Sequence, residues 1–263
     1  MEITKDKDKY IQELEDKIVS LKFNLSNKDN ELKSIQKNHK KLLNKLVHNL
    51  KNPVGAIYSF SEMILEDIEE YSTQKMVTHL NVINSSADFS IQLLNNVINY
   101  SRVQALEENF EVKNYNYIEL IEDVISDFYI ALQKKEITLK KEFPKTEIIL
   151  PINSVELKSA LVNVIHNAIR YSPKNTTIEI SIKNNIDTIT TSITDYGIGI
   201  SETNLPLVFD DFFVVNTYSE DKEKCIGLGL TIAKKIISIH NGTITIESSE
   251  NNGTTIQIEL PKR

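Results

Sequence analysis

The stretch "VELKSALVNVIHNAIRYS" (residues 155–172) has a strongly helical pattern. At 3.6 residues per turn, its apolar side chains cover most of the helix surface, and its polar side chains gather in one stripe. That stripe contains Glu156, Ser159, Asn163, His166, Asn167 and Arg170. The pattern predicts a helix that is buried over most of its surface and accessible along its polar stripe.

Two asparagines in this stripe have the spacing of ligands that act together. Asn163 and Asn167 are one turn apart and point the same way. Two neutral carbonyl oxygens do not hold a cation alone, but they can complete the coordination of a Mg²⁺ that also binds nucleotide phosphates and water. A solvated helix face is the alternative interpretation.

The segments around this helix are typical of a mixed α and β domain. Short apolar or alternating runs indicate strands, and Asn- and Gly-containing turns join some of them into hairpins. The expected strands are 137–143, 147–151, 176–183, 186–195, 242–249 and 253–260, with a further helix over 228–240. This order predicts a two-layer α+β domain over residues 110–263, with helices on one face of a mostly antiparallel sheet.

Two glycine-containing segments in this domain can contact a nucleotide. In "DYGIGI" (195–200), Asp195 follows a strand and can accept a hydrogen bond from an exocyclic amine, while Gly197 and Gly199 permit close backbone approach. In "CIGLGL" (225–230), Gly227 and Gly229 precede a helix, where backbone N–H groups favour a phosphate. The chain has neither a P-loop motif nor the lysine strand and H-R-D loop of protein kinases.

Residues 1–42 have the heptad pattern of a coiled coil. Apolar residues recur at alternating spacings of three and four, at Ile11, Leu14, Ile18, Leu21, Leu25, Leu32, Ile35 and Leu42. Charged residues occupy most of the outer positions, so the helix needs a partner to be stable in water. We expect that partner to be a second copy of the chain.

Residues 43–109 are expected to form a helical hairpin. The first helix continues from the coiled coil, with His48 and Asn52 on the face opposite its apolar residues, and Pro53 loosens it nearby. A second amphipathic helix is expected from about Thr73, joined to the first by the polar link 66–74. Two hairpins would make a dimeric four-helix bundle that exposes His48 on each first helix.

The composition excludes several classes of protein. The net charge of −7 argues against a nucleic-acid surface, which requires clustered Lys and Arg. Cys225, the single cysteine, fits a reducing compartment and excludes an internal disulfide. With no apolar run long enough for a membrane segment, we expect a cytoplasmic location.

Five motifs in order make residues 35–263 resemble the sensor histidine kinases of two-component signalling. They are the H box "VHNLKNPV" (47–54), the N box "LVNVIHNAIRYSP" (161–173), the G1 box "DYGIGI", the F box "VFDDFF" (208–213) and the G2 box "GLGL" (227–230). The resemblance implies a dimerisation and phosphotransfer hairpin, followed by an ATP-binding domain of the GHKL type that is shared with gyrase, Hsp90 and MutL. His48 would be the phospho-acceptor.

The resemblance also implies how the ATP site is arranged. Asn167 would coordinate Mg²⁺ with help from Asn163, Arg170 would approach the phosphates, Tyr171 would pack near the adenine, and Asp195 would bind its amine. The cofactor-binding set also includes Gly197, Gly199, Phe209, Gly227, Leu228 and Gly229. Residues 216–224 would be a mobile ATP lid with these glycines as hinges, and the phosphoryl group would pass to a separate response regulator.

Two residues near His48 leave alternatives open. Many relatives carry Glu or Asp directly after the histidine, whereas this chain has Asn49, which cannot act as a base. Asn52 matches a position that is linked to dephosphorylation of the response regulator. A response-regulator phosphatase and a non-catalytic ATP-binding dimer scaffold are therefore the alternatives to a kinase, and a gyrase-like or Hsp90-like ATPase is the least favoured.

Overall fold

The computed structural model describes residues 2–66, 72–106, 110–215 and 225–263. The chain divides into two compact units, residues 1–55 and residues 56–263, and each is described by itself. The expected domain boundaries at 42/43 and 109/110 stay predictions.

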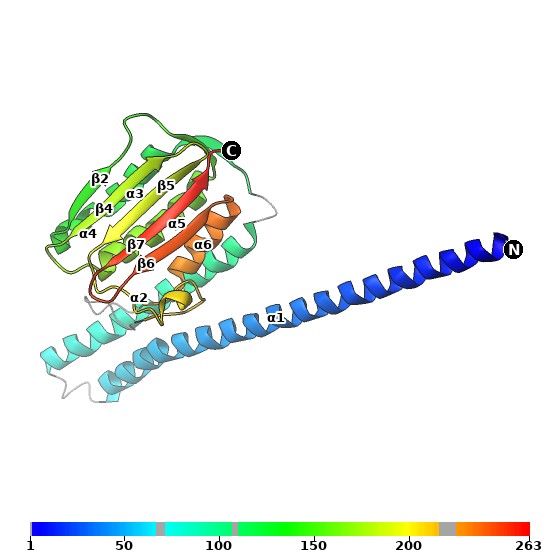
Figure 1. Cartoon of the computed structure of the whole chain (residues 1–263). Helices are drawn as coiled ribbons and strands as arrows, with labels where there is room; N and C mark the ends of the chain where they lie inside the picture. The colour runs from blue at the N-terminus through cyan, green and yellow to red at the C-terminus, as the bar shows by residue number, and fades with distance from the viewer. Residues whose placement is uncertain (1, 67–71, 107–109, 216–224) are drawn as a thin grey trace. The chain divides into compact units, whose positions relative to one another are not determined.

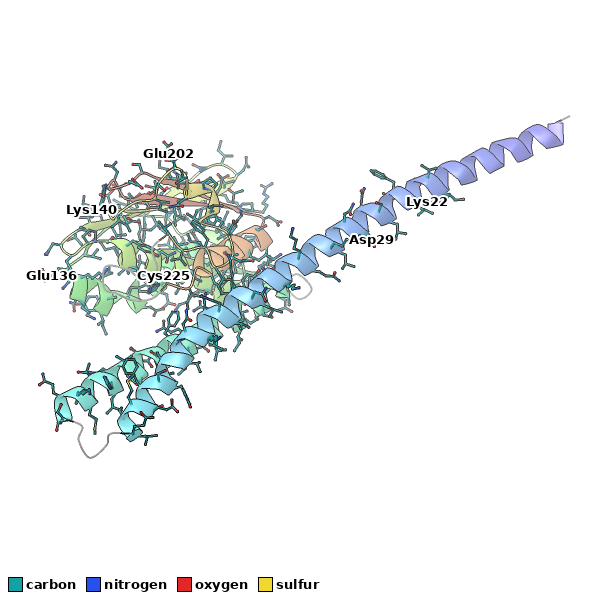
Figure 2. The ribbon with its side chains drawn as sticks, turned by 90° about the horizontal axis from the view of Figure 1, so that it is seen from below. Lys22, Asp29, Glu136, Lys140, Glu202 and Cys225 are labelled. Atoms are coloured by element: carbon teal, nitrogen blue, oxygen red, sulfur yellow. The ribbon has the colours of Figure 1, made fainter. Side chains whose placement is uncertain are left out.

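The first unit consists of most of helix α1 (Glu2–Glu66), which continues through Pro53. Lys22 and Asp29 project from its surface (Figure 2). Several apolar residues at the heptad positions are at least half exposed, namely Ile18, Leu21, Leu25 and Leu32. A partner helix in a coiled coil would cover such a row, and the coiled coil stays a prediction.

The second unit begins with the last turns of α1 and with helix α2 (Thr73–Gln104). The hydroxyl of Ser72 caps α2 by accepting a hydrogen bond from the backbone N–H of Lys75. The predicted start of this helix at Thr73 is confirmed. The rings of Phe60 on α1 and His79 on α2 pack edge to face, with centroids 4.8 Å apart.

The rest of the second unit has the α+β architecture that the sequence predicted. Its five-stranded sheet has the order β2-β4-β5-β7-β6. The strands are β2 (Thr138–Glu142), β4 (Thr177–Asn184), β5 (Thr188–Asp195), β6 (Thr243–Ser248) and β7 (Thr254–Pro261). β2 pairs in parallel with β4, and the other pairs are antiparallel.

Helices α5 (Ser154–Tyr171) and α6 (Gly229–Ile239) pack against each other and against one face of the sheet (Figure 1). Buried and less buried residues alternate along β4 and β5, so Ile178, Ile180 and Ile193 enter the core. The buried hydroxyls of Tyr117 and Thr191 share a hydrogen bond of 2.8 Å. The predicted helices over 155–172 and 228–240 and the two hairpins are confirmed.

Two helices and one short strand were not predicted, and the expected strand at 147–151 belongs to a small ladder outside the five-stranded sheet. Helices α3 (Tyr117–Asp127) and α4 (Tyr129–Lys135) follow β1 (Lys113–Asn116), which pairs with β3 (Ile149–Ile152). A short 3₁₀ turn covers Leu205–Leu207. Helix α3 buries Leu120, Ile121, Val124 and Ile125, a helical spacing that the sequence does contain. The break at Phe128 keeps each of the two helices short.

Candidate nucleotide-binding site

A pocket opens beside α5, between the end of β5 and the segment that leads into α6. Most of the predicted nucleotide-binding residues line it, namely Asn163, Asn167, Arg170, Tyr171, Asp195, Gly199, Gly227, Leu228 and Gly229. Apolar side chains complete its walls, including Ile193, Ile246 and Ile256. An apolar pocket with a few convergent polar groups is typical of a small-molecule site.

The orientation of α5 follows from its cap and its apolar side. Asn153 caps the helix by accepting a hydrogen bond from the N–H of Glu156 over 3.1 Å. Leu157, Leu161 and Val164 are buried completely. The opposite stripe, which carries Asn163 and Asn167, is therefore left at the pocket, as the sequence predicted.

The side-chain amide of Asn163 has one fixed orientation. Its Nδ2 donates to the carbonyl of Ser159 over 2.9 Å. Its Oδ1 lies against Gly229, where an added Cβ would be 2.8 Å from that oxygen. The amide oxygen is therefore directed toward the glycine segment before α6. Oxygen is the ligand that Mg²⁺ prefers.

These donors fit a Mg²⁺ that is bound through a nucleotide. The part of the chain that the structure describes contains no group of three His, Cys, Asp or Glu side chains arranged to hold a metal. Two asparagine oxygens can complete the coordination of an ion that also binds phosphates and water. The donor set thus fits a nucleotide-bound ion better than a site made of protein ligands alone.

Asp195 lies at the end of β5 and is buried. Its Oδ1 accepts the backbone N–H of Gly197 over 2.9 Å, and the backbone of Thr254 also donates to the carboxylate. Burial raises the pKa of Asp195 to about 6, and these hydrogen bonds act in the opposite direction. A fixed carboxylate in an apolar wall is a specific acceptor for an amine such as that of adenine.

Tyr171 and Cys225 meet at the pocket. The Tyr171 hydroxyl lies 3.3 Å from Sγ of Cys225. Burial raises the pKa of the Tyr171 phenol, and the neighbouring Cys225 thiol raises it further. Figure 2 labels Cys225, which follows the segment 216–224. The predicted ATP lid lies outside the described residues.

Gly197 and Phe209 do not line the pocket but support its wall. A Cβ at Gly197 would lie 2.2 Å from the carbonyl oxygen of Tyr171, so these backbones are in direct contact. The carbonyl of Phe209 accepts a hydrogen bond from Oγ1 of Thr231 on α6 over 3.1 Å. The ammonium of Lys234 lies 5.1 Å from the centre of the Phe209 ring.

Helix α2 adds residues that the sequence did not point to. Gln92 and Asn96 line the same pocket. Farther along α2, the Tyr100 hydroxyl donates to the carboxylate of Asp211 over 2.9 Å. Arg102 forms an ion pair with Glu156 at the start of α5. These residues follow from the packing of α2 on the nucleotide domain, which no local pattern encodes.

His48 lies in the first unit, on α1. Its side chain is exposed, as is that of Asn52 one turn later, whereas Asn49 is half-buried. The structure therefore confirms that the histidine is accessible on its helix. The catalytic roles of these three residues stay predictions.

Comparison with known proteins finds relatives of the nucleotide domain. Residues 152–263 match the family of histidine kinase-, DNA gyrase B- and HSP90-like ATPases. The sensor-like histidine kinase SenX3 of Mycolicibacterium smegmatis is 28% identical over 215 residues, which cover 82% of this chain and 55% of SenX3. The chain spans about half of SenX3 and less than half of several other curated relatives.

Solved structures show the same similarity. The catalytic domain of histidine kinase ThkA is 29% identical, with a TM-score of 0.52, over 58% of this chain and 96% of that domain. The structure of ThkA in complex with the response regulator protein TrrA has the same fold over 89% of this chain and 66% of that chain, with a TM-score of 0.67 and 23% identity.

The second unit of the chain therefore contains an ATPase domain of the GHKL type. The similarity to SenX3 extends into the helices before this domain. The chain is therefore similar to sensor histidine kinases over most of its length, the family that its five motifs resemble. No helix in the described ranges has the length and apolar character of a membrane span.

Proposed function

We propose that the chain is an ATP-dependent protein-histidine kinase that phosphorylates His48 and passes the phosphoryl group to an aspartate of a separate response regulator. The observation that supports this most strongly is the meeting of Asn163, Asn167, Asp195 and residues 227–229 at one pocket. The chain also carries an exposed histidine on the helix that precedes this domain.

The pocket orients ATP through groups at its two ends. Asp195 accepts a hydrogen bond from the adenine amine, and Tyr171 packs near the ring. Gly227 and Gly229 lie at the N-terminus of α6, where backbone N–H groups and the helix dipole favour phosphate. Arg170 also lines the pocket, and its guanidinium would pair with a phosphate oxygen.

Asn167 and Asn163 would hold Mg²⁺ through their carbonyl oxygens. That ion would neutralise the oxygens of the β- and γ-phosphates during transfer. Positioning and charge neutralisation are most of what phosphoryl transfer requires from a protein. The asparagine stripe of α5 supports this assignment because the orientation of Asn163 is fixed by its hydrogen bond to Ser159.

His48 supplies the nucleophile. A lone pair on a neutral imidazole nitrogen attacks the γ-phosphorus in line with the bond to the β-phosphate oxygen. The N–P bond forms as that P–O bond breaks, the electron pair of the broken bond leaves on ADP, and the imidazole releases its ring proton to water. Asn49 cannot accept this proton, because its amide is not a base at neutral pH.

The active form would be a homodimer built on a four-helix bundle and an N-terminal coiled coil. Apolar residues along α1 and α2 are exposed, including Leu43, Val47, Val77, Leu80, Ile91, Leu94 and Ile98. A second copy would cover these residues as two hairpins assemble. The aspartate acceptor would belong to a response regulator, the kind of partner with which ThkA has been solved.

The direct test uses ATP with a radioactive γ-phosphate. Incubation with Mg²⁺ should label the wild-type protein with an acid-labile, base-stable phosphoryl group, and His48→Gln should stay unlabelled. His79→Gln is the matched control, because it removes another histidine of the hairpin and should keep the label. Labelled His48→Gln, or unlabelled wild type that binds ATP, would contradict the kinase assignment.

A response-regulator phosphatase is the second candidate. It is favoured by Asn49, which removes the usual carboxylate beside His48, and by the exposed Asn52 one turn later, whose amide can orient a water molecule. In that case the protein would release phosphate from a phosphorylated receiver domain faster than it labels itself. A dimer scaffold that binds ATP would show neither activity.

A further inference from the structure

A buried lysine lies behind the nucleotide pocket. Lys135 is the last residue of α4 and is 7% exposed. Its Nζ donates to the carbonyl oxygens of Ile169 at 3.1 Å, Arg170 at 3.0 Å and Ser172 at 3.2 Å. A buried ammonium group is costly unless its N–H donors are satisfied, and three carbonyl oxygens receive them here.

The three carbonyls lie at the end of α5. The last carbonyl groups of a helix have no partner within the helix, and they form the negative end of its dipole. The hydroxyl of Ser172 donates to the carbonyl of Ala168 over 2.7 Å. The ammonium of Lys135, which belongs to α4, donates to the carbonyl of Ser172. This last turn carries Arg170 and Tyr171, which line the pocket.

Main-chain hydrogen bonds also connect the end of α4 to the segment that follows α5; this connection is called the junction below. The carbonyl of Lys135 accepts the N–H of Asn175 over 3.0 Å, and the N–H of Thr138 donates to the carbonyl of Thr176 over 2.8 Å. Glu136, labelled in Figure 2, follows Lys135 in the left-handed conformation and redirects the chain into β2. Lys135 is therefore anchored to the segment after α5 through both its side chain and its backbone.

A series of contacts connects this junction to Asp195. The carbonyl oxygen of Tyr171 touches Gly197 so closely that a Cβ there would lie 2.2 Å away. The N–H of Gly197 in turn donates to Oδ1 of Asp195 over 2.9 Å. A shift of the last turn of α5 would therefore move Gly197 and the Asp195 carboxylate, which is proposed to bind adenine.

We propose that Lys135 is a positioning residue for nucleotide recognition: its ammonium holds the last turn of α5 so that Arg170, Tyr171 and Asp195 keep the geometry that selects adenine. This inference rests on the proposed function in that it takes the pocket to bind ATP. Lys135 itself does not line the pocket, so its effect is exerted through the residues that do.

The test compares ATP with inosine triphosphate, in which a carbonyl oxygen replaces the amine that Asp195 would bind. Kd is measured for both nucleotides with wild type, Lys135→Met and Lys134→Met. Lys134 is the neighbouring lysine on the same helix, and it is exposed. We expect the preference for ATP to fall by about tenfold in Lys135→Met and to stay unchanged in Lys134→Met.

A role in stability alone would weaken binding of both nucleotides equally and leave their ratio unchanged. Lys135→Arg keeps the positive charge, so its ratio should lie nearer to the wild-type value than that of Lys135→Met. A folded Lys135→Met with the wild-type ratio would overturn the inference. Wild-type protein that binds neither nucleotide would instead refute the proposed function.

A measurement on wild type covers the case in which Lys135→Met does not fold. In protein with ¹⁵N-labelled lysine, the Nζ signal of Lys135 should be visible because its protons are held by three carbonyls, and it is assigned by its absence in Lys135→Arg. Saturation with ADP should shift this signal. An unchanged Lys135 signal would contradict the coupling.

Discussion

The backbone N–H of Gly197 donates to Oδ1 of Asp195 over 2.9 Å and holds the carboxylate at the end of β5. Burial nevertheless raises the pKa of this carboxyl to about 6. The group expected to recognise adenine therefore changes charge just below neutral pH, which makes nucleotide binding dependent on proton concentration.

ATP should bind more weakly as the pH falls below about 6. The adenine amine donates to the ionised carboxylate and so favours it, which lowers the pKa of Asp195 in the complex relative to the free protein. Between these two values, affinity should fall by up to about tenfold per pH unit. Titration calorimetry from about pH 8 to about pH 5 measures this loss.

The control for this pH dependence is Asp195→Asn, which does not titrate. Because the terminal phosphate of ATP also titrates near neutral pH, the relevant quantity is the difference in log Kd between wild type and variant. A difference that stays constant over the whole range would show that Asp195 does not titrate with nucleotide binding.

His240 should make the free energy of unfolding depend on pH. Its ring is buried, with Nδ1 2.8 Å from the carbonyl of Ile236, while Nε2 accepts the N–H of Asn153 over 3.0 Å. Burial lowers the pKa of His240 below 6.5. The unfolded chain then binds more protons than the folded one below that pH, so stability falls as the pH decreases.

Asp195 has the opposite effect, because its raised pKa makes the folded state bind protons first as the pH falls. His240→Gln separates the two contributions, since glutamine stays neutral. The difference in unfolding free energy between wild type and His240→Gln, from denaturant titrations, should shrink between about pH 7 and about pH 5. Equal pH slopes for the two proteins would mean that His240 does not titrate on unfolding.

Gly199→Ala should destabilise the nucleotide domain. Gly199 has φ +65°, and a Cβ there would lie 1.9 Å from the carbonyl oxygen of Ser249. The strained backbone alone costs about 1 kcal/mol or more, and the clash with a main-chain atom adds to it. We expect a loss of about 3 kcal/mol or more in the free energy of unfolding, measured by chemical denaturation.

Gly55 offers a matched control for this substitution. It lies inside α1, and a Cβ there would meet nothing within 4 Å. Gly55→Ala should therefore stabilise the helix by about 0.5–1 kcal/mol. A similar loss in both variants would show that the effect at Gly199 does not come from its backbone geometry.

Much of the site could be predicted because its residues occur in short local patterns. Several predicted residues line the pocket, and each belongs to a helix or a turn that its own segment encodes. They include Asn163, Asn167, Gly199, Gly227 and Gly229. Helices α3 and α4 were missed because Phe128 divides a helical pattern into two short runs. Gln92 and Lys135 could not be found, because their roles depend on packing between distant segments.

Asn49→Asp should increase the rate at which His48 becomes labelled from ATP. A carboxylate beside the histidine can accept the ring proton and stabilise the positive charge that develops during attack, whereas the Asn49 amide can do neither. Because general bases contribute about a hundredfold or more, we expect an increase of at least about tenfold in the initial rate. The measurement is the time course of acid-labile label at saturating ATP.

Asn52→Ala is the control that separates phosphorylation from dephosphorylation. Asn52 lies one turn after His48, so its loss should slow the release of phosphate from a phosphorylated receiver domain while leaving the labelling of His48 unchanged. If Asn49→Asp labels no faster than wild type, the missing carboxylate does not limit the kinase. If Asn52→Ala still dephosphorylates its partner at the wild-type rate, the water that attacks the phosphoryl group is oriented by another residue, and the phosphatase proposal loses its basis in Asn52.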